Sequence, residues 1–347
     1  MAYTTINKST DHFNTLLYTG NKTANTTISG VGFQSDFTWI KSRTTGENHH
    51  AFDALRGGGN RLYPNLSNQQ SNISTTLTSW TSDGFVTGTD DGTNANGQNF
   101  VAWNWKANGQ GSSNTDGSIN TTYTSANTTS GFSIIQYTGN STSGATIGHG
   151  LGAVPKVFMC KKTNSAGDNW SMYHAVTGNT ISMTLNSSTS TITNAKYWNN
   201  TTPTSSLITL GNGTEVNGNT DTFIGYAFAE KTGFSKFHWY TGNENANGTF
   251  VYTGFKPAFV MIKNYGAVST DWFIHDNRRL GYNDKNYGLF ANLTNTEATD
   301  INLDLLSNGF KLRRSTNQLN HAGNYYIYMA FAEAPLVGSN NVPCTAR

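Results

Sequence analysis

The sequence predicts an all-β protein of three tandem repeated, antiparallel β-sandwich units of the jelly-roll kind. The phrase Tyr-Thr-Gly-Asn occurs three times, at Tyr18–Asn21, Tyr137–Asn140 and Tyr240–Asn243, with copies a little over one hundred residues apart. Repetition at this spacing indicates copies of one small domain. Short apolar runs separated by Gly, Asn and Asp turns, without a sustained helical period, are typical of sandwich or jelly-roll strands.

Four strands can be matched between the copies. The opening strand ends at the repeated Tyr, in Phe13–Tyr18, Phe132–Tyr137 and Phe234–Tyr240. A buried strand ending in Lys follows, in Phe37–Lys41, Val157–Lys161 and Phe259–Lys263. The third strand reads His49–Asp53, Trp170–His174 and Trp272–Asp276. The closing aromatic strand reads Phe100–Trp105, Phe223–Phe228 and Tyr326–Phe331. Asp-Gly and Asn-Gly turns precede it in the first and third copies and predict hairpins.

The repeats set the expected boundaries of the units at residues 11–107, 130–231 and 232–335. Residues 108–129 are rich in Gly, Ser, Asn and Thr, which predicts a flexible linker that lets the first unit sit apart. Only Lys231–Gly233 separates the later units, so these must pack closely. A single pseudo-threefold body with one shared core is the alternative arrangement.

The two ends of the chain lie outside the repeat. Residues 1–10 are polar and predict an extended N-terminal docking arm, and residues 336–347 form a C-terminal tail. Cys160 and Cys344 do not supply a disulfide framework. The start of the chain lacks the pattern of a secretory signal peptide, and no apolar run approaches the ~20 residues of a membrane span, so membrane insertion is not expected.

The composition suits an extracellular protein or one on the surface of a particle. Charged residues make up 12% of the chain, about half of the ~25% usual in soluble proteins, so Asn, Thr, Ser and Gly must cover the surface. The net charge is +2 without a Lys/Arg cluster, which argues against nucleic-acid binding. The chain is expected to fold in a cytoplasm, although its surface resembles that of an exported protein. A virion component that is released by lysis fits both expectations.

No catalytic, cofactor or metal residue is predicted. The chain holds only 20 Asp and Glu residues, and none forms a recognisable catalytic motif. His49 and His50 lack a third ligand at a usual spacing, and Asp90–Asn94 lacks the closing Glu of a calcium loop. We therefore expect a protein that is not an enzyme.

Binding candidates come from aromatic residues and from two ion pairs. Trp170, Trp198, Trp239 and Trp272 are suited to stacking on sugar rings, as is Tyr197, and Trp198 is expected to be the most exposed because its surroundings are the most polar. Trp39, Trp103 and Trp105 alternate within strands and predict core. Acidic and basic residues three apart either anchor a ligand or brace a loop; these are Asp53 with Arg56 and Asp276 with Arg279.

Loops are expected to make any contact with a host, because the strands belong to the repeated cores. The loops that differ most between copies are Thr44–His50, Asn194–Thr204, Ser269–Asp271 and Asn283–Lys285. Weak contacts of this kind become useful through many copies. A homo-oligomer is therefore expected, with a trimer favoured.

The chain resembles a family of structural proteins of tailed bacteriophages, mainly marine phages. The resemblance covers nearly the whole chain and is clearest in Met1–Ser9, Phe13–Asn21, Gly32–Phe33, Phe37–Arg43, Phe100–Lys106, Gly131–Asn140, His149–Pro155, Pro203–Ser206 and Gly254–Lys263. It implies a virion protein of lectin-like β architecture, whose partners are other virion proteins and a host-surface glycan. A tail fibre or similar appendage for host contact is the first expectation. A capsid decoration protein and a glycan depolymerase are the alternatives.

Overall fold

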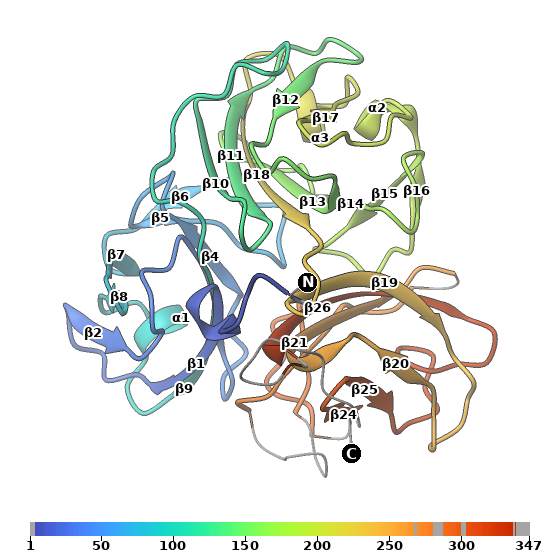
Figure 1. Cartoon of the computed structure of the whole chain (residues 1–347). Coiled ribbons are helices and arrows are strands. Elements are labelled where there is room, and N and C mark those ends of the chain that lie inside the picture. Colours follow the sequence, from blue (N-terminus) through green and yellow to red (C-terminus); the bar gives the residue numbers. More distant parts are fainter. Residues whose placement is uncertain (1–3, 267–268, 280–286, 300–302, 336, 338–347) are drawn as a thin grey trace.

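The computed structural model describes the chain except for residues 1–3, 267–268, 280–286, 300–302, 336 and 338–347. It is all-β and consists of antiparallel sheets, as the sequence predicts. Figure 1 shows three lobes around a common centre, coloured blue, green and orange to red along the chain. We call them the first, second and third units, in chain order.

The first unit has a sheet of four strands in the order β1-β9-β3-β4 and a second sheet in the order β2-β8-β7. Its strands are β1 (Phe13–Thr19), β2 (Thr26–Ser29), β3 (Phe37–Ser42), β4 (His50–Asp53), β5 (Asn60–Arg61), β6 (Ser71–Asn72), β7 (Leu77–Thr81), β8 (Gly84–Thr87) and β9 (Asn99–Trp105). The short helices are η1 (Ser9–Asp11) and α1 (Asp91–Asn94).

The second unit has a sheet of seven strands in the order β10-β11-β18-β13-β14-β15-β16, and the pair β12-β17. Its strands are β10 (Tyr123–Asn127), β11 (Phe132–Thr138), β12 (Thr146–Gly148), β13 (Pro155–Lys162), β14 (Ser171–His174), β15 (Ile181–Thr184), β16 (Ile192–Thr193), β17 (Leu207–Thr209) and β18 (Thr222–Ala229). The helices are α2 (Ala195–Trp198) and α3 (Thr214–Asn217).

The third unit has a sheet of five strands in the order β19-β26-β21-β22-β23 and a second sheet in the order β20-β25-β24. Its strands are β19 (Ser235–Thr241), β20 (Phe250–Tyr252), β21 (Phe255–Asn264), β22 (Phe273–Asp276), β23 (Leu289–Phe290), β24 (Leu303–Leu306), β25 (Gly309–Leu312) and β26 (Tyr325–Pro335). The register of β21 against β26 shifts at Pro257, where a strand tolerates a residue without an N–H.

The same strand neighbours occur in the large sheet of each unit. The opening strand pairs with the closing strand, which also pairs with the Lys-containing strand, and this in turn pairs with the strand that ends in Asp or His. The registers agree as well, because the repeated Tyr lies opposite the first aromatic residue of the predicted closing strand in each case. These pairs are Tyr18 with Phe100, Tyr137 with Phe223 and Tyr240 with Tyr326.

The repeated Tyr-Thr-Gly-Asn phrase fixes the end of the opening strand. In the second unit, Tyr137 Oη donates to Val216 O at 2.7 Å, and Asn140 N donates to the buried Asn217 Oδ1 at 2.9 Å. A Cβ on Gly139 would lie 2.4 Å from a backbone oxygen, so only glycine fits there. Equivalent bonds and close approaches occur at Tyr18–Asn21 with Asn94 and at Tyr240–Asn243 with Asn320.

A shared aromatic core joins the three units. Ring centroids are 4.3 Å apart for Phe37 and Tyr226, 5.2 Å for Phe13 and Phe331, and 5.7 Å for Phe228 and Phe331. These contacts join the first unit to the second, the first to the third, and the second to the third. The expectation that the first unit sits apart is therefore wrong, because its apolar sheet face is buried against both neighbours.

Two expected boundaries also differ from the structure. Tyr123–Asn127, within the predicted linker 108–129, forms β10 and pairs with β11, so this stretch extends the sheet of the second unit. The described part of the predicted docking arm, residues 4–10, packs on the body. Thr4 and Ser9 are buried, and Ile6 is 2% exposed in the shared core, since its apolar side chain gains free energy there.

Candidate functional site

Four of the aromatic residues that the sequence favoured for binding are buried, namely Trp170, Tyr197, Trp198 and Trp272. Trp198 is 2% exposed, and its Nε1 donates to Ile181 O at 3.1 Å. Tyr197 is 5% exposed, with its hydroxyl 3.4 Å from Glu215 Oε1. The prediction that Trp198 is exposed is wrong, because α2 turns its ring and that of Tyr197 into the core of the second unit. Trp39, Trp103 and Trp105 lie in the core, as predicted.

Trp170 and Trp272 bond each unit to the one before it. Trp170 Nε1 donates to Tyr63 O of the first unit at 2.9 Å, and Trp272 Nε1 donates to Thr184 O of the second unit at 3.0 Å. His49 occupies the corresponding place in the first unit, and its Nε2 lies 2.9 Å from Phe290 O of the third unit. Trp39 donates to the other nitrogen of His49, so Nε2 carries the proton and donates. These three bonds close a ring.

The two Asp–Arg pairs belong to the same interfaces. Asp53 Oδ2 accepts from Arg56 Nε at 2.6 Å and from Tyr226 Oη of the second unit at 2.7 Å. All three side chains are buried, so the pair has no free face for a ligand. The Asp53–Arg56 pair thus holds the hydroxyl of a neighbouring unit.

Asp276 and Arg279 repeat this arrangement at the interface between the third and first units. Asp276 Oδ2 accepts from Arg279 Nε at 2.6 Å and from Trp103 Nε1 at 3.0 Å. Burial opposes ionisation of Asp276, but the charge and hydrogen bonds of Arg279, with the bond from Trp103, lower the pKa of this carboxyl. The buried carboxylate is therefore ionised and paired.

The interface between the second and third units lacks both partners of this arrangement. His174 replaces the Asp, and Met329 occupies the register position of Trp103 and Tyr226. His174 Nε2 lies 3.4 Å from Tyr328 O instead, and burial lowers the pKa of His174 to about 3. This interface therefore lacks both the carboxylate acceptor and the Trp or Tyr donor that the other two interfaces have.

Buried lysines complete two of these interfaces. Lys161 Nζ donates to Ser67 O of the first unit at 3.1 Å, and Lys263 Nζ donates to Ser188 O of the second unit at 2.8 Å. Burial lowers the pKa of each amine to about 8. Backbone carbonyls bind the amines, which therefore serve the assembly of the units.

An exposed aromatic row lies on the large sheet of the third unit. We define it as Tyr265, Tyr325 and Trp239, which lie on three neighbouring chain segments: the residue after β21, the start of β26, and β19. Ring centroids are 6.1 Å apart for Tyr265 and Tyr325 and 5.8 Å for Tyr325 and Trp239. Trp239 is 41% exposed and Tyr325 is 45% exposed. The exposed ring of His238 stacks beside Trp239 with centroids 6.3 Å apart.

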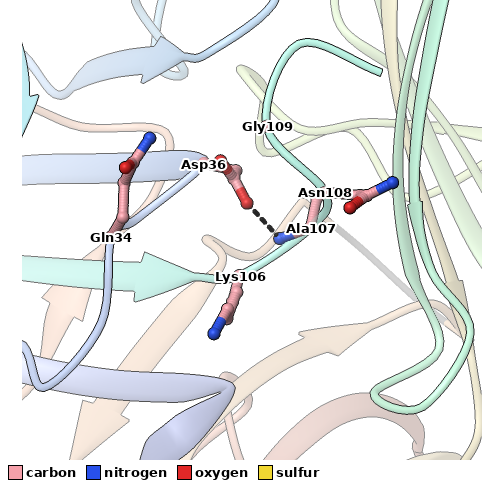
Figure 2. A pocket seen from close by; sticks show the side chains of 6 residues that line it. All are labelled: Gln34, Asp36, Lys106, Ala107, Asn108 and Gly109. Carbon is pink, nitrogen blue, oxygen red and sulfur yellow. Dashed lines mark hydrogen bonds between the residues drawn. The ribbon is translucent and has the colours of Figure 1, made fainter. Parts of the chain in front are cut away.

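A cleft of about 330 Å³ lies where the chain leaves the first unit, lined by Gln34, Asp36, Lys106, Ala107, Asn108 and Gly109. Asp36 accepts a hydrogen bond from Ala107 N at 2.7 Å, drawn in Figure 2, and burial raises the pKa of its carboxyl. Figure 2 shows that Gln34, Lys106 and Asn108 point in different directions. The cleft therefore lacks a convergent set of polar groups, and Asp36 holds the backbone of the following turn.

Three carboxylates of the second unit, Asp168, Asp221 and Glu215, lie beside lysines. Lys162 contacts both Asp168 and Asp221, and Lys196 Nζ is 3.2 Å from Glu215 Oε1. Within the described residues, no three His, Cys, Asp or Glu side chains gather closely enough to hold a metal ion. None of the helices in the described part of the chain has the length and apolar character of a membrane span.

Sequence reasoning named Trp239 among four tryptophans but missed Tyr265 and Tyr325. Both could have been found by aligning the copies, because Tyr325 precedes the closing strand at the place of Asn99 and Thr222. The predicted contact loop Asn283–Lys285 and the tail residue Cys344 lie outside the described residues.

Comparison with known proteins gives a family without an assigned activity. Neither the search of curated proteins nor the search of solved structures gave a match. A family model described as a domain of unknown function, DUF7483, matches residues 8–335, which include all three units. The chain belongs to the DUF7483 family.

Proposed function

We propose that the protein is a non-enzymatic structural component of a bacteriophage virion, displayed on a tail fibre or similar appendage, where the third unit contacts the host surface. The observation that carries the proposal is the aromatic row Tyr265–Tyr325–Trp239, an exposed aromatic surface on a body whose other tryptophans are mostly buried. Clustered exposed aromatic side chains mark binding surfaces.

The rest of the body supports a role in display. The Asp–Arg pairs, the ring N–H groups of Trp103, Trp170 and Trp272, and the buried Lys161 and Lys263 form bonds within and between the units. Such a body presents a surface rigidly, which lowers the entropy lost on binding. Asp168, Asp221 and Glu215 of the second unit are paired with lysines, which disfavours them as acid and base.

We also propose that the three units are repeats of one jelly-roll-like sandwich module. The shared strand neighbours, the equal registers of the repeated Tyr and the matching buried Asn94, Asn217 and Asn320 support this. Superposition of the large sheets in an experimental structure tests it. Sheets that superpose only after a change of strand order would refute the repeat.

Antibody labelling of intact phage particles tests the location. An antibody against this chain, with gold detection in the electron microscope, is expected to label the tail or an appendage. The purified chain is expected to be a homo-oligomer, with a trimer favoured, and light scattering measures this. Absence of label on purified particles would refute the virion assignment.

A capsid decoration role is the second candidate. Phe250 and Tyr252 are 44% and 53% exposed on the outward face of β20, which suits contact with a shell protein. Label distributed over the capsid would favour this role. Phe250→Ala with Tyr252→Ala would then reduce incorporation into particles, while Trp239→Gln would not.

A further inference from the structure

We propose that the aromatic row is a binding site for a neutral carbohydrate chain, which lies across the three segments that carry Tyr265, Tyr325 and Trp239. The inference rests on the proposed role in host contact and assigns the chemical class of the ligand. It is carried by three observations: the placement of the rings, the residues at the same positions of the other units, and the chemistry of the exposed groups.

The rings form a diagonal on one face of the sheet. Tyr325 lies opposite Thr241, and Trp239 lies opposite Ile327, so Tyr325 and Trp239 are diagonal neighbours on the same face. Tyr265 N bonds to Tyr325 O at 3.0 Å, which sets the third ring beside the second. Further along that face of β26, Met329 and Phe331 are buried in the shared core. The row lies where this face emerges from the core.

The sheet beneath the row is rigid. Ile327, opposite Trp239, is 1% exposed and also pairs with Lys263. Lys263 Nζ bonds to Ser188 O of the second unit at 2.8 Å, so the neighbouring unit fixes the sheet at this point. A ligand on the row meets rings whose backbone is already ordered, and this reduces the entropic cost of binding.

The fold does not require aromatic residues at these positions. Three positions define the row in each unit. The position of Trp239 is the residue before the repeated Tyr, and the position of Tyr325 is the residue paired with the repeated Thr. The position of Tyr265 is the residue whose N–H bonds to the backbone oxygen of that paired residue. The first unit has Leu17, Asn99 and Arg43 there, and the second has Gln136, Thr222 and Thr163.

The other two units show what these positions do when they serve only the fold. Thr163 Oγ1 and Thr222 Oγ1 bond to each other at 2.7 Å, and Arg43 Nε bonds to Glu297 Oε1 of the third unit at 2.7 Å. In the third unit all three positions hold large aromatic residues, and two of them are more than 40% exposed. Aromatic residues at all three positions, two of them exposed and the third, Tyr265, partly buried beside them, point to a ligand.

The exposed groups match a sugar. Each ring of the row joins an apolar face to one polar atom, Oη of Tyr265 and Tyr325 or Nε1 of Trp239. A sugar likewise has an apolar C–H face bordered by hydroxyl groups. Burial raises the pKa of Tyr265, so its hydroxyl remains protonated and uncharged at neutral pH. An uncharged row complements a neutral saccharide better than an acidic one.

Binding of defined saccharides to the purified full-length protein tests the site. The neutral probes are maltohexaose, cellohexaose, chitohexaose and mannohexaose, and a hyaluronan hexamer is the acidic comparison. Calorimetry and tryptophan fluorescence measure the binding of each probe. We expect at least one neutral probe to bind, with an affinity that changes little between low and high salt because no charges are paired. Failure of all four neutral probes, or tighter binding of the acidic probe, would overturn the inference.

The variants replace the row with residues of the second unit. Trp239→Gln with Tyr325→Thr introduces the side-chain types of Gln136 and Thr222, which the same fold already accommodates. We expect this double variant to lose about tenfold or more in affinity. The matched control is Phe250→Ala with Tyr252→Ala, which removes two other exposed aromatic rings and should leave the affinity unchanged. Equal loss in both double variants would contradict the site.

Phage carrying these variants separate the ligand class from the host-contact role. If the purified protein binds a neutral saccharide but phage with Trp239→Gln and Tyr325→Thr adsorb normally, the carbohydrate site is supported and host contact through it is refuted. Impaired adsorption without binding of any neutral probe would refute the carbohydrate and leave the contact role standing. Binding of a host protein that this double variant abolishes would likewise replace the carbohydrate by a protein partner.

Discussion

Replacing His275 with Phe should stabilise the protein, and more so in acid. His275 lies in β22 and is fully buried, and neither of its ring nitrogens has a hydrogen-bond partner among the described residues. The first unit has Phe52 at the same register position, and the second has Tyr173. A buried unpaired polar group costs about 1–3 kcal/mol, so His275→Phe should raise the free energy of unfolding by about that amount at pH 7.

The pH dependence follows from the pKa of His275, which burial lowers to about 3. The unfolded chain has a histidine pKa of about 6.5, so between these values only the unfolded state takes up the proton. Above about pH 6.5 the lowered pKa of His275 does not affect the free energy of unfolding. As the pH falls from about 6.5 towards about 3, this free energy decreases, because protonation of His275 favours the unfolded state. At pH 5 the loss is about 2 kcal/mol, from roughly 1.4 kcal/mol per pH unit. The advantage of His275→Phe should widen by this amount.

Urea denaturation at pH 7 and pH 5, followed by tryptophan fluorescence, measures both effects. The matched reciprocal variant is Phe52→His, which places an unpaired imidazole in the first unit and should lower stability and steepen its fall in acid. A stability gap between wild type and His275→Phe that is the same at both pH values would refute the account of a neutral buried imidazole. Strong destabilisation by His275→Phe would show that the site cannot hold the larger ring.

Three further changes test the interfaces and the core. Tyr226→Phe removes the hydroxyl that bonds to Asp53 Oδ2 and should cost about 1–2 kcal/mol in urea denaturation; an unchanged midpoint would contradict a contribution from that bond. Trp198→Ala truncates a core residue and should lower the free energy of unfolding by about 3–5 kcal/mol, while host adsorption per folded particle stays unchanged. An adsorption defect without loss of stability would show instead that Trp198 contacts the host. Asn217→Ala leaves Asn140 N and two carbonyls without their partner and should lower the melting temperature by several degrees, with Asn219→Ala, exposed in the same turn, as the neutral control.

Local pattern was enough to predict the all-β class and its antiparallel strands. Alternation, turn residues and the repeated Tyr-Thr-Gly-Asn are properties of neighbouring residues, and they set strand ends and registers within one unit. How the units meet depends on contacts between residues far apart in the sequence, such as Trp103 with Asp276 or Tyr226 with Asp53. The Gly- and Ser-rich composition of residues 108–129 therefore suggested mobility where β10 forms.

The failure at Trp198 and the missed Tyr325 have one physical cause. Polar neighbours in the sequence indicated exposure for Trp198, but α2 places its ring on the inner side and its polar neighbours outside. Tyr325 belongs to an aromatic strand and therefore resembles core, although it lies beyond the last residue of its face that the neighbouring units cover. Exposure depends on where a unit stops being covered by another unit. That limit is best found by asking which unit departs from the others at a fixed register position, and that comparison selects Tyr265, Tyr325 and Trp239 together.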